Sequence, residues 1–350
     1  MTTKPKVAFF DTKPYDRLSF ERFMNDYPVD IHFYHPHLSE ETVALTQGFD
    51  AVCVFVNDSV SREVTEQLCN NGVRLIALRC AGYNNVELES VYGKIHVVRV
   101  PEYSPYAVAE HTVALLLALN RKTHKAYSRT RDSNFSINGL LGFDLHGKTA
   151  GIIGTGKIGR VTIGILRGFG MKVLAFDPYP NEKAAQELGY THVDLAQLYA
   201  ESDIISLHCP LTPENMYMIN RKSIAQMKEG VFILNTGRGK LINTSDLIEG
   251  LKSQKIGAAG LDVYEEETDY FFEDFSGEVL TDDVLARLLT FPNVLVTSHQ
   301  AFFTREALNN IANTTLTNIT SYFEKGELAH EVCYRCGKGE CIRQKTGKCF

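Results

Sequence analysis

Three segments of the chain carry the side chains that reduction of a 2-keto acid requires, and each directly follows an apolar run. Arg238 lies between two glycines, Glu265 to Glu267 are three consecutive carboxylates, and His299 stands between a serine and a glutamine. A guanidinium can bind a carboxylate through two parallel hydrogen bonds. Histidine is the usual proton donor and acceptor near neutral pH, and a neighbouring carboxylate raises its pKa and holds its tautomer. A surface turn around Arg238 and a solvated loop for two of the glutamates are the plain alternatives, because spacing alone does not show that these groups meet.

A glycine pattern in the middle of the chain predicts a dinucleotide site. Gly154, Gly156 and Gly159 are spaced G-x-G-x-x-G between an apolar β-prone run and a segment of helical character. In this context the glycines allow a tight turn, close approach of a pyrophosphate and close packing of helix on strand. Asp177 ends the next apolar run, 18 residues after Gly159, where a carboxylate binds the adenosine ribose and repels the extra phosphate of NADP. The pattern therefore predicts NAD as cofactor, against a chance glycine-rich turn.

Two further groups near strand ends admit more than one interpretation. The turn around Gly82 follows an apolar run and could bring backbone N–H groups to a small anion, or could be a turn without a ligand. His32, His35 and His37 could suggest a metal site. With Pro36 among them and no cluster of carboxylates or cysteines nearby in sequence, a solvated strand end is favoured.

The apolar runs alternate with amphipathic segments in two series, from residue 1 to about 100 and from about 148 to 299. Such alternation predicts two parallel sheets covered by helices. A long helix is expected from Tyr106 to about Lys125, and another from Ala301 to about Glu324 that returns the chain to the first domain. At 350 residues, two domains are the natural expectation.

The overall composition is that of a globular metabolic protein. The chain is 44% hydrophobic and 22% charged, with a net charge of −6 and no long basic run, which argues against nucleic acid as a partner. The apolar runs are too short for a signal peptide or a membrane span, so the interpretation is a cytoplasmic protein without a membrane partner.

The last 18 residues differ in character from the rest, because they hold four of the eight cysteines among basic residues and glycines. No metal is predicted elsewhere. Here thiolate ligation of zinc or of an iron–sulfur cluster, redox or regulatory chemistry, and a mobile tail with unpaired thiols all remain open. The four residues are Cys333, Cys336, Cys341 and Cys349.

Several motifs together resemble the D-specific 2-hydroxyacid dehydrogenases, most closely their fermentative D-lactate dehydrogenase branch. The resemblance covers residues from about 4 to 330 and rests on segments in matching order and spacing. They are Gly260 to Glu267, Thr236 to Gly239, Ser298 to Phe302, Pro101 to Pro105, Asp269 to Asp274 and Asp282 to Leu285.

This resemblance implies an α/β fold of two doubly wound parallel-sheet domains, with a Rossmann NAD-binding domain (103–299) inserted into a flavodoxin-like substrate domain (1–102 and 300–332). The cysteine-rich tail, 333–350, is not part of the family pattern. It implies reversible reduction of pyruvate to D-lactate in the cleft between the domains, with Arg238 binding the carboxylate, His299 as acid/base and Glu267 as its partner. The implied substrate contacts are Ala81, Gly82, Tyr103 and Phe302. The implied cofactor contacts are Gly154, Thr155, Gly156, Lys157, Ile158, Gly159, Asp177, His208, Cys209, Pro210, Asn215, Thr236, Gly237, Arg238 and Asp262.

Two other functions stay open at this point: a dehydrogenase of a larger D-2-hydroxy acid, and an NAD-sensing protein like the corepressors related to this family. The resemblance also implies a homo-oligomer, a dimer or a tetramer, paired through the cofactor domains.

Overall fold

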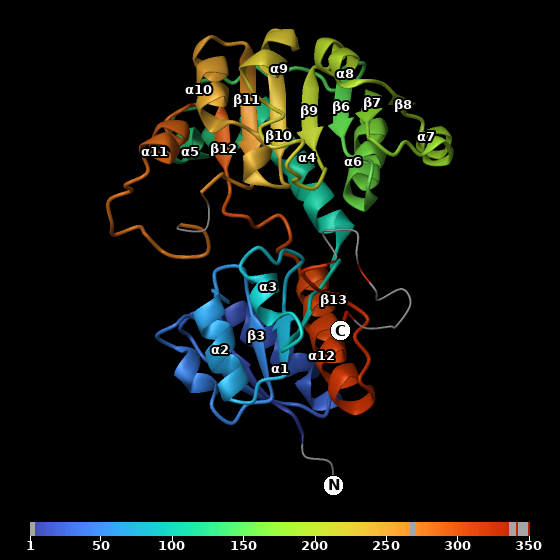
Figure 1. Cartoon of the computed structure of the whole chain (residues 1–350). Coiled ribbons are helices and arrows are strands. Elements are labelled where there is room, and N and C mark those ends of the chain that lie inside the picture. The colour runs from blue at the N-terminus through green and yellow to red at the C-terminus, as the bar shows by residue number, and fades with distance from the viewer. Residues whose placement is uncertain (1–3, 267–269, 336–340, 342–348) are drawn as a thin grey trace. The chain divides into compact units, whose positions relative to one another are not determined.

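A computed structural model describes residues 4–266, 270–335, 341 and 349–350. The chain forms two compact units, drawn in Figure 1: unit 1 is Met1–Ser104 with Phe303–Phe350, and unit 2 is Pro105–Phe302. Unit 2 is therefore inserted into unit 1.

Unit 1 is built on a sheet of strand order β13-β5-β4-β3-β1-β2. Its strands are parallel except β13, which pairs antiparallel with β5 and adds an edge that the sequence pattern did not predict. Without β13 the order is the flavodoxin-like 2-1-3-4-5. The strands are β1 (Lys6–Phe9), β2 (Asp30–Phe33), β3 (Ala51–Val54), β4 (Leu75–Leu78), β5 (His96–Val98) and β13 (Glu331–Val332).

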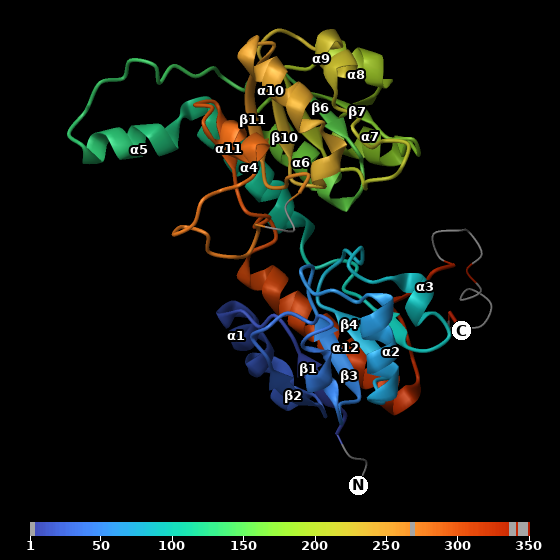
Figure 2. The same cartoon turned by 60° about the vertical axis from the view of Figure 1, so that its left-hand side comes forward.

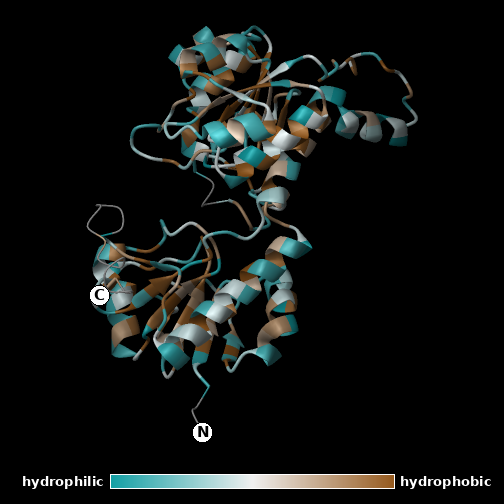
Figure 3. Ribbon diagram, turned by 90° about the vertical axis from the view of Figure 1, so that its right-hand side faces the viewer, coloured by the Kyte–Doolittle hydropathy of each residue, from teal (hydrophilic) through white to brown (hydrophobic). Residues whose placement is uncertain are grey.

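Strands β3 and β4 are apolar and buried at every position, as expected where helices cover both faces of a parallel sheet. The long helix α12 packs on α1 and supplies Ala312, Leu316 and Ile319 to the core. Figure 3 shows the apolar strands inside each unit and polar helix faces outside. The helices of unit 1 are α1 (Pro14–Phe23), α2 (Arg62–Asn70), α3 (Leu88–Val91) and α12 (Arg305–Lys325), with 3-10 turns η1 (Met24–Asp26) and η2 (Val43–Thr46).

Unit 2 has a sheet of order β12-β11-β10-β9-β6-β7-β8, all parallel. Counted from β6, this is the Rossmann order 3-2-1-4-5-6 with one more strand, and the order reverses between β6 and β9. Its strands are β6 (Thr149–Ile153), β7 (Lys172–Phe176), β8 (Thr191–His192), β9 (Ile204–Leu207), β10 (Val231–Asn235), β11 (Ile256–Leu261) and β12 (Val294–Val296).

The first helix of unit 2 ends earlier than the sequence pattern predicted. Lys122 adopts a left-handed backbone (φ 50°), which separates α4 from α5. The end of α4 is fixed by Asn120, whose side chain donates to the Phe143 carbonyl (2.7 Å) and accepts from the Phe143 N–H (2.9 Å). The helices are α4 (Pro105–Arg121), α5 (Thr123–Arg131), α6 (Lys157–Gly168), α7 (Glu182–Leu188), α8 (Leu195–Glu201), α9 (Arg221–Gln226), α10 (Thr244–Lys252) and α11 (Asp283–Leu289), with the 3-10 turn η3 (Gly239–Leu241).

Candidate active site

The glycine loop after β6 has the shape that a dinucleotide pyrophosphate needs. Gly154 has φ 98°, and a Cβ there would lie 2.6 Å from the His208 carbonyl carbon. A Cβ on Gly159 would lie 2.0 Å from the Gly154 oxygen, so only glycine allows α6 to pack this closely on the turn. Gly156 precedes α6, and its Cα faces open space. The N–H groups of Lys157 and Ile158, the first two residues of α6, thus offer a site for an anion.

Asp177 follows β7, the strand next to β6, as the fingerprint predicted. Its Oδ2 accepts hydrogen bonds from the Thr155 N–H (2.7 Å) and the Thr155 hydroxyl (3.0 Å), and its Oδ1 accepts from the Tyr179 N–H (2.9 Å). Burial raises the pKa of this carboxyl, but the hydrogen bonds from Thr155 and Tyr179 outweigh burial and lower the pKa overall. The half-buried carboxylate therefore stays ionised beside the glycine loop, where it fits NAD better than NADP.

The segment after β9 lies against the glycine loop. Nε2 of His208 forms a hydrogen bond with the Ser206 hydroxyl (2.9 Å). Burial lowers the pKa of this histidine to about 4. Its ring is therefore neutral at neutral pH. The predicted contacts Cys209 and Pro210 follow directly, and Asn215 closes this loop by donating to the Pro210 carbonyl (2.7 Å).

Arg238 follows β10 in a turn that the Asn235 side chain holds from both sides. The Asn235 amide donates to the Arg238 carbonyl (2.9 Å) and accepts from the Gly237 N–H (3.0 Å). A Cβ on Gly239 would lie 2.0 Å from the Tyr264 carbonyl oxygen, so this turn and the loop after β11 touch through their backbones. Glycine at 239 is therefore a packing requirement, and Arg238 is fixed next to the carboxylate-rich loop.

Thr236, in the same turn, is 7% exposed and exchanges a hydroxyl–hydroxyl hydrogen bond of 2.8 Å with Thr112 of α4. The Thr236-Gly237-Arg238-Gly239 turn is thereby tied to a helix as well as to the sheet.

His299 lies in a turn after β12 that is organised around the fully buried Asp262. Oδ1 of Asp262 accepts from the Thr297 hydroxyl (2.5 Å) and the Gln300 N–H (2.9 Å), and Oδ2 accepts from the Ala301 N–H (2.8 Å). The His299 N–H donates to the Asp262 carbonyl (2.7 Å), and the residue adopts a left-handed backbone, φ 51°. This strained turn is held by the Asp262 hydrogen bonds, which preorganise the histidine. Asp262 was predicted as a cofactor contact; its carboxylate is engaged with the histidine turn.

His111 also contacts this turn, and it is not among the residues predicted for the site. Its Nε2 on α4 lies 3.0 Å from the Thr297 hydroxyl and 3.4 Å from Asp262 Oδ1. No local pattern marks His111, because it precedes its partners by more than 150 positions in a helix that otherwise looks like core.

The three glutamates after β11 separate in the structure. Glu265 is half-buried and accepts from the Thr244 N–H at the start of α10 (2.6 Å), and the exposed Glu266 pairs with Lys240 (3.5 Å). Glu266 is thus solvated, whereas Glu265 is held against the start of α10. Glu267, predicted as the partner of His299, lies outside the described residues.

An aromatic pair accompanies the histidine. The Phe272 ring centre lies 6.0 Å from that of His299 and 6.5 Å from that of Phe302, and Phe302 is 8% exposed. Phe302, predicted as a substrate contact, is thus grouped with the predicted acid/base residue in unit 2.

The predicted substrate residues of unit 1 lie at the carboxyl end of its sheet. The Ala81 carbonyl accepts from the Arg99 guanidinium (2.7 Å), and the Cα of Gly82 faces open space. Tyr103 is half-buried, and its carbonyl accepts from the Asn310 amide of α12 (2.6 Å). The turn around Gly82 is therefore fixed in place while leaving room at the glycine.

The base of that turn is a buried charge cluster. Arg79 is 1% exposed, donates to the Asp11 carbonyl (2.7 Å), and lies 3.4 Å from Asp16 Oδ2 and 4.0 Å from Asp58 Oδ2. Burial raises the pKa of Asp58 to about 6, although Arg79 opposes that shift. One guanidinium thus interacts with several buried carboxylates, and these contacts fix Arg79 at the start of the turn.

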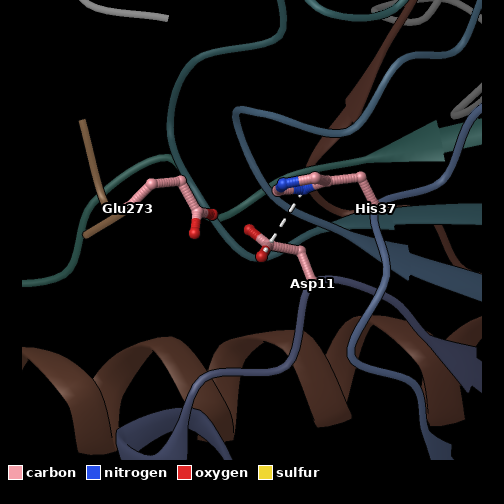
Figure 4. A group of neighbouring side chains, drawn as sticks. All are labelled: Asp11, His37 and Glu273. Carbon is pink, nitrogen blue, oxygen red and sulfur yellow. Dashed lines mark ion pairs between the residues drawn. The ribbon is translucent and has the colours of Figure 1, made fainter. Parts of the chain in front are cut away.

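His37, one of the three clustered histidines, pairs with a carboxylate that is distant in sequence. Figure 4 shows its ring facing Asp11, with Nδ1 3.5 Å from Oδ1. Asp11 is fully buried and also pairs with Lys13 (2.9 Å). Glu273 in the same picture belongs to unit 2, and Asp11 with His37 alone does not make up a metal site.

In the C-terminal segment, Cys333 and Cys349 are buried and Cys341 is half-buried, while Cys336 lies outside the described residues. Among the residues that the structure describes, no group of three metal-ligating atoms includes a cysteine of this segment.

The fold and the glycine loop define an NAD-binding α/β protein with an arginine after β10 and a histidine after β12, the strands on either side of β11. The family model for the NAD binding domain of D-isomer specific 2-hydroxyacid dehydrogenases matches residues 113–301. The chain is 54% identical over 323 residues to the D-lactate dehydrogenase of Escherichia coli, covering 92% of this chain and 98% of that protein. This chain therefore belongs to the D-isomer specific 2-hydroxyacid dehydrogenases, which are NAD-dependent oxidoreductases.

Two solved structures show the same fold. The pyruvate reductase of Chlamydomonas reinhardtii is 42% identical with a TM-score of 0.89, covering 93% of this chain and 98% of that chain. D-lactate dehydrogenase with NAD⁺ from Lactobacillus jensenii is 32% identical with a TM-score of 0.80, covering 94% and 100%. Within the described part of this chain, no helix combines the length and apolarity needed to cross a bilayer.

Proposed function

We propose that this chain catalyses the reversible reduction of pyruvate to D-lactate. The observation that carries the proposal is the joining of three strand-end loops in unit 2. Gly239 brings the Arg238 turn against the loop after β11, and Asp262 of that loop holds the turn of His299. Relatives of this chain are D-lactate dehydrogenases and a pyruvate reductase. An anion-binding guanidinium and a proton-transferring imidazole are thus fixed at one edge of the sheet that carries the cofactor loop.

NADH bound at the Gly154 loop supplies the hydride that reduces C2 of the substrate. Arg238 binds the carboxylate and stabilises the charge that develops on the C2 oxygen, and protonated His299 gives its proton to that oxygen. In the reverse direction neutral His299 accepts the hydroxyl proton. Glu267 is the carboxylate partner of His299 and stabilises the imidazolium by its negative charge. The backbone of Ala81 and Gly82 also binds the carboxylate, and Tyr103 and Phe302 surround a small methyl group.

The test is an initial-rate screen of 2-keto acids with NADH and NADPH, with pyruvate and NADH expected to give the highest kcat/KM. A branched or aromatic 2-keto acid preferred over pyruvate would establish the dehydrogenase of a larger acid instead. NADH binding without turnover of any 2-keto acid would establish an NAD-sensing protein.

Two variants test the assigned roles. His299→Gln is expected to lower kcat by a factor of about 10² to 10⁴, the usual contribution of acid–base catalysis, with little change in the dissociation constant of NADH. Glu267→Gln is expected to move the alkaline limit of pyruvate reduction to lower pH, and Glu266→Gln, the exposed neighbour paired with Lys240, serves as its control. An active His299→Gln enzyme, or an unchanged pH profile for Glu267→Gln, would contradict the assignments.

We also propose that the protein forms homodimers through the arm of unit 2 that begins at α5. Figure 2 shows α5 and the segment after it extending from the body of unit 2. No residue of α5 is buried, and Phe135, Ile137 and Leu141 are between 76% and 88% exposed. Apolar side chains gathered on an extended arm are typical of a subunit interface.

Light scattering after size exclusion is expected to give a dimer for the wild type and a smaller species for Ile137→Asp. Val279→Asp, at an equally exposed apolar residue elsewhere in unit 2, is the control. A monomeric wild type, or an Ile137→Asp variant of unchanged mass, would refute this interface.

A further inference from the structure

The two described ends of the cysteine-rich segment lie together on unit 1. Cys333 directly follows β13 and is 3% exposed, and Cys349, the penultimate residue, is 1% exposed. Both thiols are therefore packed inside unit 1, as is usual for cysteines that behave as small hydrophobic residues. The chain therefore returns to β13 after residues 334–348.

Specific contacts hold the chain end at this surface. The Cys349 N–H donates to Glu331 Oε2 (2.7 Å), while Glu331 Oε1 lies 2.6 Å from Nδ1 of His96 on β5. The Phe350 ring stacks on the His96 ring at 4.3 Å between centres with an interplanar angle of 4°. The position of Cys349 is thus fixed by a polar contact on one side and an aromatic stack on the other.

The backbone of Cys349 is hydrogen-bonded to Glu331, two residues before Cys333, so the two buried thiols are neighbours on unit 1. Burial first, and then hydrogen bonds with the Cys333 thiol and the Glu331 carboxylate, raise the pKa of the Cys349 thiol. Two thiols in contact are close to the separation from which a disulfide forms with little backbone movement. A zinc ion needs four donors, and within the described ranges no group of three donor atoms includes either cysteine.

We propose that Cys333 and Cys349 are a dithiol–disulfide site, which a low-molecular-weight disulfide such as oxidised glutathione converts into an intramolecular disulfide. The site is independent of the reaction proposed above. Its product closes residues 334–348 into a loop and links the chain end covalently to the residue after β13.

The exchange proceeds in two balanced steps. The Cys349 thiol, nearest the chain end, loses its proton to solvent and attacks one sulfur of the external disulfide, releasing one thiolate that is then protonated. The Cys333 thiol loses its proton and attacks the Cys349 sulfur of the mixed disulfide, releasing the second external thiol. Two protein thiols are oxidised and one external disulfide is reduced to two thiols. Because both sulfurs are buried and the pKa of the Cys349 thiol is raised, each step requires local opening around the two cysteines, and exchange is slow.

Peptide mapping of the full-length protein tests the site directly. The protein is incubated with excess oxidised glutathione, unfolded, alkylated and digested with trypsin without reduction. Trypsin separates all four cysteines of the segment, giving residues 326–335, 336–338, 339–343 and 349–350. The expected product is 326–335 joined to 349–350, with loss of two of the eight thiols. All eight thiols remaining, or a link from either residue to Cys336 or Cys341, would overturn the proposal.

Variants identify the partners. Cys333→Ser and Cys349→Ser are each expected to abolish the intramolecular link, whereas Cys69→Ser, at the half-buried cysteine of α2, should leave it unchanged. A link of wild-type yield that persists in either tail variant would refute the pair. Far-UV circular dichroism confirms that each variant is folded, and the wild-type map decides the question even if a variant does not fold.

Discussion

Asp262→Asn is the sharpest test of how unit 2 positions its histidine. The substitution keeps the shape of the side chain but replaces one acceptor oxygen by an amide that only donates. If the amide oxygen takes the place of Oδ1, it keeps the Thr297 and Gln300 bonds, and the amide nitrogen faces the Ala301 N–H, donor against donor. If the amide nitrogen instead takes the place of Oδ1, the two hydrogen bonds that Oδ1 accepts from Thr297 and Gln300 are lost.

The least costly arrangement therefore loses one charge-assisted hydrogen bond, worth about 1.5–3 kcal/mol, and leaves a buried N–H without a partner, which costs about 1–3 kcal/mol more. We expect unfolding of Asp262→Asn to require about 3–5 kcal/mol less free energy than that of the wild type. The turn relaxes from its left-handed conformation at His299, and a displacement of this kind can lower kcat about 10²-fold.

Urea unfolding, kcat for pyruvate reduction and NADH affinity by fluorescence separate the alternatives. If Asp262 positions His299, stability and kcat fall while the dissociation constant of NADH changes little. If Asp262 instead binds the cofactor, NADH affinity falls with kcat and stability is retained. A variant with wild-type stability and wild-type kcat would refute the reasoning altogether.

Three other substitutions have defined outcomes. Gly239→Ala places a Cβ 2.0 Å from the Tyr264 carbonyl oxygen and should lower both kcat and the free energy of unfolding, the latter by about 1–3 kcal/mol. Gly164→Ala, where the new Cβ on α6 meets open space, is the control and should not destabilise the protein. Equal stability of the two variants would contradict the packing argument. Because the pKa of His208 is lowered in the folded protein, the unfolded chain binds the proton first, and stability falls by roughly 3 kcal/mol as pH drops from about 6.5 to about 4. The free energy of unfolding of His208→Gln, measured with urea, should depend less on pH over that range than that of the wild type. Parallel pH dependences of the two proteins would contradict this. Asp177→Ser should raise the ratio of kcat/KM for NADPH to that for NADH at least tenfold, and an unchanged ratio would remove Asp177 from cofactor selection.

The fold was predictable because its signals are local. Apolar runs of four to six residues, followed by helical periodicity, repeat along both units, and buried parallel strands require such runs. The antiparallel strand β13 was not predictable, since two residues carry no period. The end of α4 at Arg121 was missed because the side chain that fixes it, Asn120, bonds to Phe143 more than twenty positions away.

The sequence marks candidate site residues by their place at strand ends, and their roles stay predictions. Strand-end placement identified Arg238 and His299, because parallel strands bring their carboxyl ends to one edge of a sheet. The supports of these residues were not visible: Gly239 looks like a turn glycine, and His111 looks like part of a core helix. Both act through contacts with chain segments that are far away in sequence. The contacts that hold Cys349, with Glu331 directly and through it with His96, likewise depend on the fold.

Asp177 and Asp262 show why burial decides between roles that the sequence leaves equal. Both are single aspartates directly after an apolar strand, and both were predicted to contact the cofactor. Asp177 is half-buried, and its oxygens accept from a loop that the cofactor must approach, so its charge is available to a ribose. Asp262 is fully buried, and both of its oxygens accept from the residues around His299. An ionised carboxylate withdrawn from water is stable only with such partners, so substitution of Asp177 should appear in cofactor selectivity, and substitution of Asp262 in stability and kcat.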